Sequence, residues 1–318
     1  MKSECDAANS DGRCLNSVLT AAETKRAIEA FAATTSLEMS AKDARGLTQA
    51  RPFVKPGTMV SITWMSHDTD DVRVAAAAAL SDASYAPIPH IAARYLTSVN
   101  AVERLMQRLT QEGGVDQIFV IGGDRDNVDG EFSSALELLA RCRLYRFGIR
   151  RIGVGGYPEG HPSIPNAVLE SALDTKLAVI ADEGMEPFIM TQFAFEAAPI
   201  FFWLGRLRER GNECEVRVGL AGPAGIGTLL RYARSCGVGA STRALFKHGA
   251  AIKRALSETA PDSVIRDLNE TREFAKYGPV AVHLFPFGGL ARTARWIAAV
   301  AAGKFDLDAG QSGFLLRG

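Results

Sequence analysis

Short apolar runs alternate with amphipathic stretches along this chain, and the pattern repeats about every thirty to forty residues. Apolar runs of this length between helical stretches are typical of the buried strands of parallel α/β sheets. The predicted strands cover residues 34–39, 59–64, 88–92, 117–121, 151–155, 187–193, 215–220 and 280–285. Eight strands with helices between them favour a (β/α)8 barrel of the TIM type over an open doubly wound sheet.

Helical periodicity fills most of the segments between these strands. The predicted helices cover residues 70–84, 99–112, 131–147, 166–184, 199–210 and 225–236, with a longer helical region over 242–277. No linker rich in glycine, serine or proline divides the chain. We therefore expect a single barrel domain over residues 26–318, preceded by a flexible tail over residues 1–25.

Composition excludes several classes of function. Lysine plus arginine equals aspartate plus glutamate at 36 each, so no net charge gathers nucleic acid or an anionic membrane. The apolar stretches 72–80 and 294–302 are too short to span a bilayer and are expected to be buried helix faces. Five scattered cysteines without a Cys-x-x-Cys pair argue against a metal centre, and the charged first twenty residues against a signal peptide. A cytoplasmic protein with reduced thiols is expected.

Chemically capable residues follow most of the predicted strands. In a barrel of parallel strands the catalytic groups gather at the carboxyl ends of the strands. The residues at those ends are Glu38, Thr63, Trp64, His90, Gly122, Gly123, Asp124, the loop from Gly156 to Pro162, Gln192 and His283. Their convergence on one face of the barrel carries more weight than any single residue.

Each of these residues also has an ordinary structural explanation. A lone glutamate such as Glu38 is more often solvated or ion-paired than catalytic, and His90 and His283 are equally well explained as core histidines bonded to the backbone. Gly122 and Gly123 with the aspartate after them form a tight turn on local grounds alone. They do not form a dinucleotide fingerprint, because the third spaced glycine opening a helix is missing.

The predicted face suits a flat, conjugated and partly anionic ligand. Glycines in the turn after the fourth strand let the backbone approach a ring edge, while Trp64, Tyr157 and Phe193 offer aromatic surfaces. Lys176 and the two histidines supply groups for a pyrophosphate or a ring carbonyl. A flavin fits this description.

Several motifs together resemble the methylenetetrahydrofolate reductase family. They are the strand ending in Glu38, Ser61-Ile62-Thr63-Trp64, Pro89-His90, Gly122-Gly123-Asp124, Tyr157-Pro158-Glu159-Gly160-His161-Pro162 and Thr191-Gln192-Phe193. Their order and spacing follow that family's barrel from about residue 30 to residue 300. The loop after the fifth strand and the Thr-Gln-Phe run are the most specific of them.

The resemblance implies a barrel that binds FAD without a covalent link. It implies ping-pong hydride transfer from NADH or NADPH to the flavin, and then to 5,10-methylenetetrahydrofolate, giving 5-methyltetrahydrofolate. Glu38 holds the place of the family's catalytic acid, Asp124 that of the aspartate beside flavin and folate, and Gln192 that of the pterin contact. Tyr232 falls where the family has an aromatic that packs on folate or nicotinamide. The implied FAD contacts are Thr63, His90, Gly122, Gly123, Asp124, Phe132, Tyr157, His161 and Lys176. Family members also commonly form homo-oligomers.

The chain departs from the family pattern at three places. The usual prolines after the catalytic glutamate are replaced by Met39-Ser40-Ala41-Lys42, and Gly122 replaces an arginine. The arginine expected near the last strand is missing, and Arg292 is a candidate to replace it in binding folate or nicotinamide. These departures leave two alternatives open. One is a divergent reductase with another electron donor, and the other is a FAD- or folate-binding partner subunit with little NAD(P)H activity.

Overall fold

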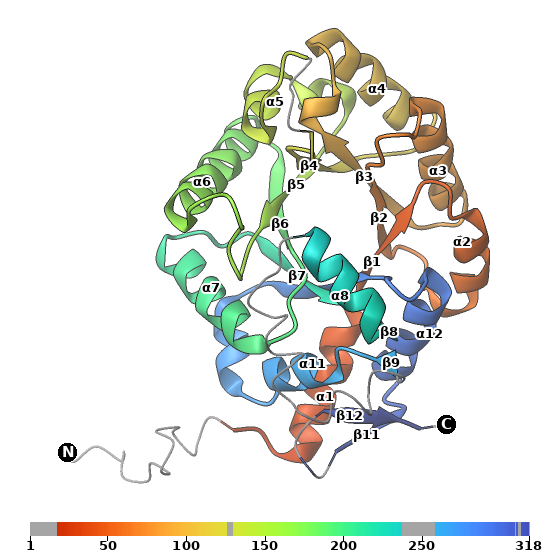
Figure 1. The fold of residues 1–318 in the computed structure, drawn as a ribbon, viewed down its shortest axis with the longest axis vertical. Helices are drawn as coiled ribbons and strands as arrows, with labels where there is room; N and C mark the ends of the chain where they lie inside the picture. The colour runs from red at the N-terminus through yellow and green to blue at the C-terminus, as the bar shows by residue number, and fades with distance from the viewer. Residues whose placement is uncertain (1–17, 126–129, 237–257, 309, 311–312, 318) are drawn as a thin grey trace, which may run out of the picture.

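Eight parallel strands close into a barrel in the computed structural model of this chain (Figure 1), which describes residues 18–125, 130–236, 258–308, 310 and 313–317. The barrel strands are β1 (Ser36–Ser40), β2 (Met59–Thr63), β3 (Ala86–Ala92), β4 (Gln117–Ile121), β5 (Arg151–Gly156), β6 (Glu186–Thr191), β7 (Glu215–Ala221) and β10 (Val280–Phe285). Neighbours in the sheet follow chain order, and β1 closes the ring by pairing with β10. The closing register aligns Ser36 with His283. The fold is a (β/α)8 barrel, as predicted.

Helices surround the strands as an outer layer (Figure 1). They are α1 (Ala21–Ala33), α2 (Ala44–Ala50), α3 (Asp70–Asp82), α4 (Val99–Gln111), α5 (Ala135–Arg141), α6 (Asn166–Asp182), α7 (Ala197–Glu209), α8 (Ile226–Ser235), α11 (Asp262–Asn269) and α12 (Leu290–Ala301). Side-chain oxygens cap several of their first turns, and Thr20 and Glu23 form a reciprocal capping box at α1. Within the described residues, no helix is both long and apolar enough to cross a membrane.

Alternating strand residues fill the barrel interior. Ile88, Phe119, Phe188 and Met190 form a buried cluster separate from the core beneath the helices. Gly153 on β5 makes room for it, because a Cβ there would lie 2.4 Å from a Phe188 ring carbon and 2.6 Å from one of Phe119. This apolar layer closes the barrel as a packed core rather than a pore, so ligands reach only its ends.

The strand predictions are confirmed with shifts of up to two residues, whereas two helix predictions are wrong. The predicted helix 131–147 divides into α5 and a 3₁₀ turn at Leu144–Phe147. The described part of the region predicted as helical over 242–277 contains a short strand at Glu258–Thr259, α11 and a 3₁₀ helix at Arg272–Tyr277; residues 242–257 lie outside the described residues. Pro261 lies between that strand and α11, where its ring removes a backbone donor.

Both ends of the chain also differ from expectation. The boundary predicted at residue 25 falls inside α1, whose amphipathic pattern begins at Ala21, while residues 1–17 of the predicted tail lie outside the described residues. At the other end, β11 (Phe305–Leu307) and β12 (Phe314–Leu316) form an antiparallel pair that the sequence did not predict. The apolar stretches 72–80 and 294–302 lie within α3 and at the end of α12, respectively, as predicted.

Helix α8 lies in front of the barrel strands in Figure 1. Its Ala233 packs in a cluster with Phe193, the second residue after β6, and with Phe285 at the end of β10. Tyr232 of the same helix stacks on Phe287, with ring centroids 4.1 Å apart. These contacts place α8 at the carboxyl ends of the strands, where the site residues were predicted.

Candidate active site

Glu38 lies inside the barrel near the end of β1, between two histidines that reach it from other strands. Its Oε2 atom is 3.7 Å from Nε2 of His90 on β3 and 3.9 Å from Nε2 of His283 on β10. All three residues are at most 9% exposed. Three strands that are far apart in sequence therefore bring one carboxyl and two imidazoles together.

Burial sets the charge of this group. Desolvation raises the pKa of Glu38, although the nearby His90 opposes the effect. Desolvation also lowers the pKa of His90 to about 4 and that of His283 to about 3. The imidazoles are therefore neutral at neutral pH and supply no cation to hold Glu38 ionised. A carboxyl in such a site keeps its proton to higher pH than an exposed one, as a general acid requires.

Ser36 fixes the orientation of His283. Its Oγ lies 2.9 Å from Nδ1 of His283, so the opposite ring nitrogen faces Glu38. The Nε2 atoms of both His283 and His90 are buried and have no hydrogen-bond partner within the described part of the chain. Thr63 supports the same region by donating to the Met39 carbonyl at 3.2 Å. The site thus contains buried polar atoms with unused hydrogen-bonding capacity.

The loop after β1 is held by an ion pair instead of the family's prolines. Lys42 Nζ lies 2.8 Å from Oδ1 of Asp68, whose side chain is only 1% exposed. Asp43 then caps α2 by accepting from the Gly46 amide. The ion pair ties the β1 loop to the β2 loop, which restrains the segment that follows Glu38.

The turn after β4 adopts a conformation that needs glycine. Gly123 has φ of +91°, and a Cβ on it would lie 3.2 Å from the Tyr95 ring. A Cβ on Gly122, by contrast, would meet no atom within 4 Å, so that backbone borders open space. Asp124 is exposed at the rim and accepts a 2.5 Å hydrogen bond from the Tyr95 hydroxyl.

The loop after β5 is compact and aromatic. The rings of Tyr157 and His161 meet edge to face, with centroids 5.6 Å apart. The Ser163 amide donates to Nδ1 of His161, which orients the imidazole. Gly160 has φ of +81°, which allows the loop to reverse. Burial raises the pKa of the Tyr157 hydroxyl, so this group remains a neutral donor.

Gln192 follows β6 at the same face of the barrel. Its Oε1 accepts from the amide of Phe193, which fixes one side of the amide group. Thr191 anchors the strand end by accepting from the Gly219 amide at 2.8 Å. Near them, Phe193 packs edge to face against three rings, those of Phe195, Phe285 and Phe287. Together with Tyr232 these rings form an aromatic wall between the barrel and α8.

Three further predicted contacts lie beyond the strand ends, on or just before the helices that follow them. Phe132 is fully buried in the core, with the Arg141 guanidinium over its ring. Lys176 lies ten residues into α6, about 15 Å along the helix from its first residue, and burial lowers its pKa. Arg292 lies in the first turn of α12. Their predicted roles stay predictions.

The structure adds residues that the sequence did not single out. Arg94 and Tyr95, in the 3₁₀ turn η3 (Ala93–Tyr95) after β3, contact the turn after β4. Ser36 and Asp68 support the histidine and the β1 loop described above. Arg94 and Tyr95 closely follow the predicted strand 88–92, so the expectation that site residues gather at the carboxyl ends of strands could have found them. Nothing in the sequence distinguishes Ser36 or Asp68. No group of three or more metal-ligating side chains gathers among the described residues.

Comparison with known proteins gives one family and one fold. The family model described as methylenetetrahydrofolate reductase matches residues 23–253. A solved protein from Clostridium thermocellum, described as uncharacterized and binding two copies of 5-methyl-5,6,7,8-tetrahydrofolic acid, is 12% identical with a TM-score of 0.54. The match covers 85% of this chain and 93% of that one. Dihydropteroate synthase from Thermus thermophilus is 15% identical with a TM-score of 0.45, over 84% of this chain and 92% of its own.

Proposed function

This chain belongs to the methylenetetrahydrofolate reductase family, and from that premise we propose that it reduces 5,10-methylenetetrahydrofolate to 5-methyltetrahydrofolate by ping-pong hydride transfer from NADH or NADPH through FAD. The observation that carries the proposal is Glu38, a buried carboxyl beside two neutral imidazoles at the carboxyl ends of the strands. The folate bound by the Clostridium thermocellum barrel supports the choice of substrate class.

The residues present fit a flavin. Gly122 leaves open space beside its backbone, and two buried ring nitrogens, the donor Nε1 of Trp64 and Nε2 of His90, lack hydrogen-bond partners in the described ranges. Tyr157 and His161 form a stiff edge on the neighbouring strand end. Thr63, Gly122, Gly123, Asp124 and these groups would hold FAD, which supplies a two-electron hydride carrier when bound.

The chain's own residues account for the proton and the orientation. Glu38 keeps its proton to higher pH than an exposed carboxyl because burial disfavours the anion, and its proposed task is to donate that proton to the folate nitrogen as the five-membered ring opens. Gln192 offers its amide nitrogen to the pterin, since its oxygen is bonded to the Phe193 amide. The aromatic wall beneath α8 presents Tyr232 to the folate or the nicotinamide, with its other face on Phe287.

The purified protein tests this proposal directly. We expect it to be yellow, to bleach when mixed anaerobically with NADH or NADPH, and to regain colour on addition of 5,10-methylenetetrahydrofolate. A protein that does not bind FAD would overturn the proposal. Bleaching by neither nucleotide, with FAD bound, would instead favour another electron donor or a partner-subunit role.

A further inference from the structure

The 3₁₀ turn η3 holds the turn after β4 from the neighbouring strand end. The Arg94 amide donates to the Gly122 carbonyl at 3.0 Å, and the Arg94 guanidinium donates to the Arg125 carbonyl at 3.0 Å and the Ser133 carbonyl at 2.8 Å. These bonds go to backbone oxygens and do not depend on the side chains of the held turn. The position of Asp124 is therefore set by residues that follow β3 as well as by its own strand.

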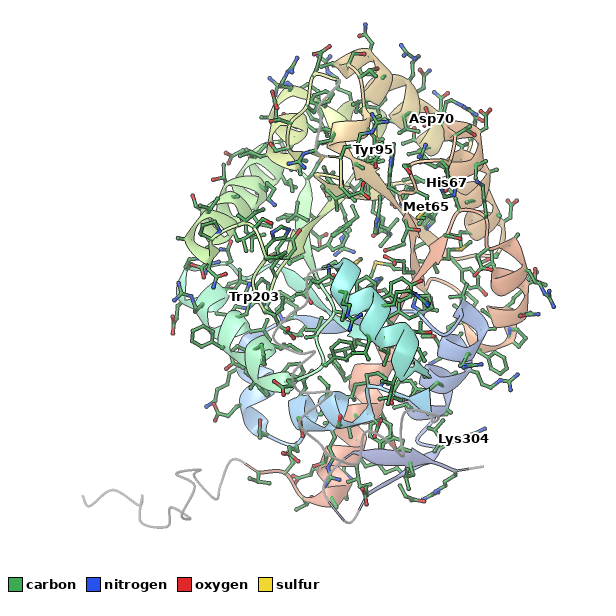
Figure 2. All side chains as sticks on the ribbon, viewed as in Figure 1. Met65, His67, Asp70, Tyr95, Trp203 and Lys304 are labelled. Atoms are coloured by element: carbon green, nitrogen blue, oxygen red, sulfur yellow. The ribbon has the colours of Figure 1, made fainter. Side chains whose placement is uncertain are left out.

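Tyr95 binds the Asp124 carboxyl group directly. Its hydroxyl lies 2.5 Å from Oδ1 of Asp124, a distance typical of a hydrogen bond to an ionised acceptor. The bond to Asp124 is the main cause of a raised pKa of the Tyr95 phenol, and the Ser66 hydroxyl bonds to the same group. Figure 2 shows Tyr95 at the rim of the barrel near Met65 and His67, which flank Ser66 in the sequence.

The Tyr95 ring is itself held on several sides. The Arg125 guanidinium lies over it at 4.5 Å, and the Trp64 ring lies 6.0 Å away on the β2 side. Arg73 covers Trp64 in turn, at 3.6 Å. The close approach of Gly123 to the ring leaves no space for a side chain there. This row of alternating cations and rings restricts the phenol to one orientation.

We propose that Tyr95 is a positioning residue that holds the Asp124 carboxylate and offsets part of its charge toward the flavin. This rests on the proposed function, in which Asp124 lies beside FAD. A carboxylate beside a flavin disfavours its reduction, because reduction adds electron density to the ring. A hydrogen bond from Tyr95 withdraws charge from Asp124 and weakens that effect. Tyr95 therefore keeps the bound flavin easier to reduce than Asp124 alone would allow.

The potential of the bound flavin tests this role. We expect Tyr95→Phe, which keeps the ring and its stacking, to make the two-electron midpoint potential more negative, with a three- to tenfold change in the reduction equilibrium, or about 15–30 mV. In an Asp124→Asn background the same substitution is expected to have little effect. Tyr145→Phe, an exposed tyrosine on the 3₁₀ turn at Leu144–Phe147, serves as the matched control. Equal shifts in both backgrounds, or no shift in either, would overturn the role of Tyr95.

A second measurement does not depend on flavin. The protein as purified is labelled at tyrosine Cζ, and the Tyr95 resonance is assigned among the six tyrosines by its loss in Tyr95→Phe. Asp124→Asn is expected to move that resonance and leave the others in place; an unmoved resonance shows that the hydrogen bond is absent and overturns the inference. A protein without FAD contradicts the proposed function, and the resonance then still decides the contact. If the protein binds FAD but Tyr95→Phe does not change the midpoint potential of the flavin, only the proposed role of Tyr95 is contradicted.

Discussion

Buried or half-buried ionisable side chains occur at both ends of this barrel, and the two ends differ in how these side chains are paired. At the amino ends of the strands, Arg151 lies 2.6 Å and Arg217 2.6 Å from carboxylate oxygens of Glu215, and Arg151 also lies 3.0 Å from Glu186. At the carboxyl ends, the groups that face the Glu38 carboxyl are two neutral imidazoles, at 3.7 and 3.9 Å. The first end pairs its cations with carboxylates, whereas the second places its carboxyl beside neutral side chains.

This difference separates stability from chemistry within one barrel. An internal ion pair keeps its groups ionised and has little left to offer a substrate. A buried carboxyl without a cationic partner has a raised pKa, as Glu38 has here, and such a group is suited to exchanging a proton. The interior layer of Ile88, Phe119, Phe188 and Met190 lies between the two ends, with the Arg151 guanidinium over the Phe188 ring on one side and His90 against Phe119 on the other.

The largest expected effect is on the folate half-reaction, from a substitution at the carboxyl ends of the strands. Glu38→Gln keeps the shape of the side chain and removes its exchangeable acid. We expect the folate half-reaction to fall about 10²- to 10⁴-fold, while reduction of the flavin by NADH or NADPH is retained. Anaerobic stopped-flow absorbance measures each half-reaction separately. Loss of both, or of neither, would contradict the assignment of Glu38 as the acid.

The next effect belongs to the opposite end. Glu215→Gln leaves the Arg151 and Arg217 guanidiniums without their shared carboxylate, and we expect the free energy of unfolding to fall by about 3–5 kcal/mol. Both half-reactions should be unchanged at temperatures where the variant is folded. Urea denaturation provides the measurement, and Asp306→Asn, in an exposed pair with Arg317, is the control with a change below about 1 kcal/mol. A Glu215→Gln protein that is stable but inactive would contradict the assignment of stability to the amino ends and of activity to the carboxyl ends of the strands.

A third effect is a dependence of stability on pH that arises at the carboxyl ends of the strands. The pKa of His283 is lowered from 6.5 to about 3. Between these two pH values the His283 imidazole binds a proton in the unfolded chain but not in the folded one. Stability is therefore lost as pH falls from 6.5 toward 3, by up to about 1.4 kcal/mol per pH unit for one imidazole. The raised pKa of Glu38 acts in the opposite direction and offsets part of this.

A variant isolates the His283 contribution. His283→Gln is expected to lose less stability than the parent protein between about pH 6.5 and pH 4.5 in urea denaturation. His67→Gln removes an exposed imidazole and should follow the parent protein. Identical pH slopes for all three proteins would show that His283 is not held neutral by burial.

The barrel and much of its mouth were predictable because both follow from local patterns. Apolar runs become strands wherever they can be covered, and parallel strands put their carboxyl ends on one face. That rule selected Glu38, His90 and His283 from the sequence, and the three side chains meet inside the barrel. The helix predicted over 131–147 was wrong because helical periodicity continues through Cys142 and Arg143, where the chain turns.

Other features have no local signal. Lys42 and Asp68 are separated by a whole strand, and nothing in the sequence around either residue marks them as an ion pair. Tyr95 reads as an ordinary aromatic after a strand until the turn after β4 is placed beside it. The polar groups at the amino ends, Arg151 and Glu215, look in the sequence like ordinary charges at strand starts. They pair only because the strands that carry them, β5 and β7, are brought together in the closed barrel.

By itself, the sequence determined the (β/α)8 alternation, the face on which the candidate site residues lie and the family to which the chain belongs, since each follows from short-range periodicity or from motifs at strand ends. Only the tertiary structure decided which of the polar residues are neutral, which are ion-paired and which remain unsatisfied. The physical reason is that protonation depends on burial and on partners from distant strands. Glu38 acquires its raised pKa only when β3 and β10 close around it.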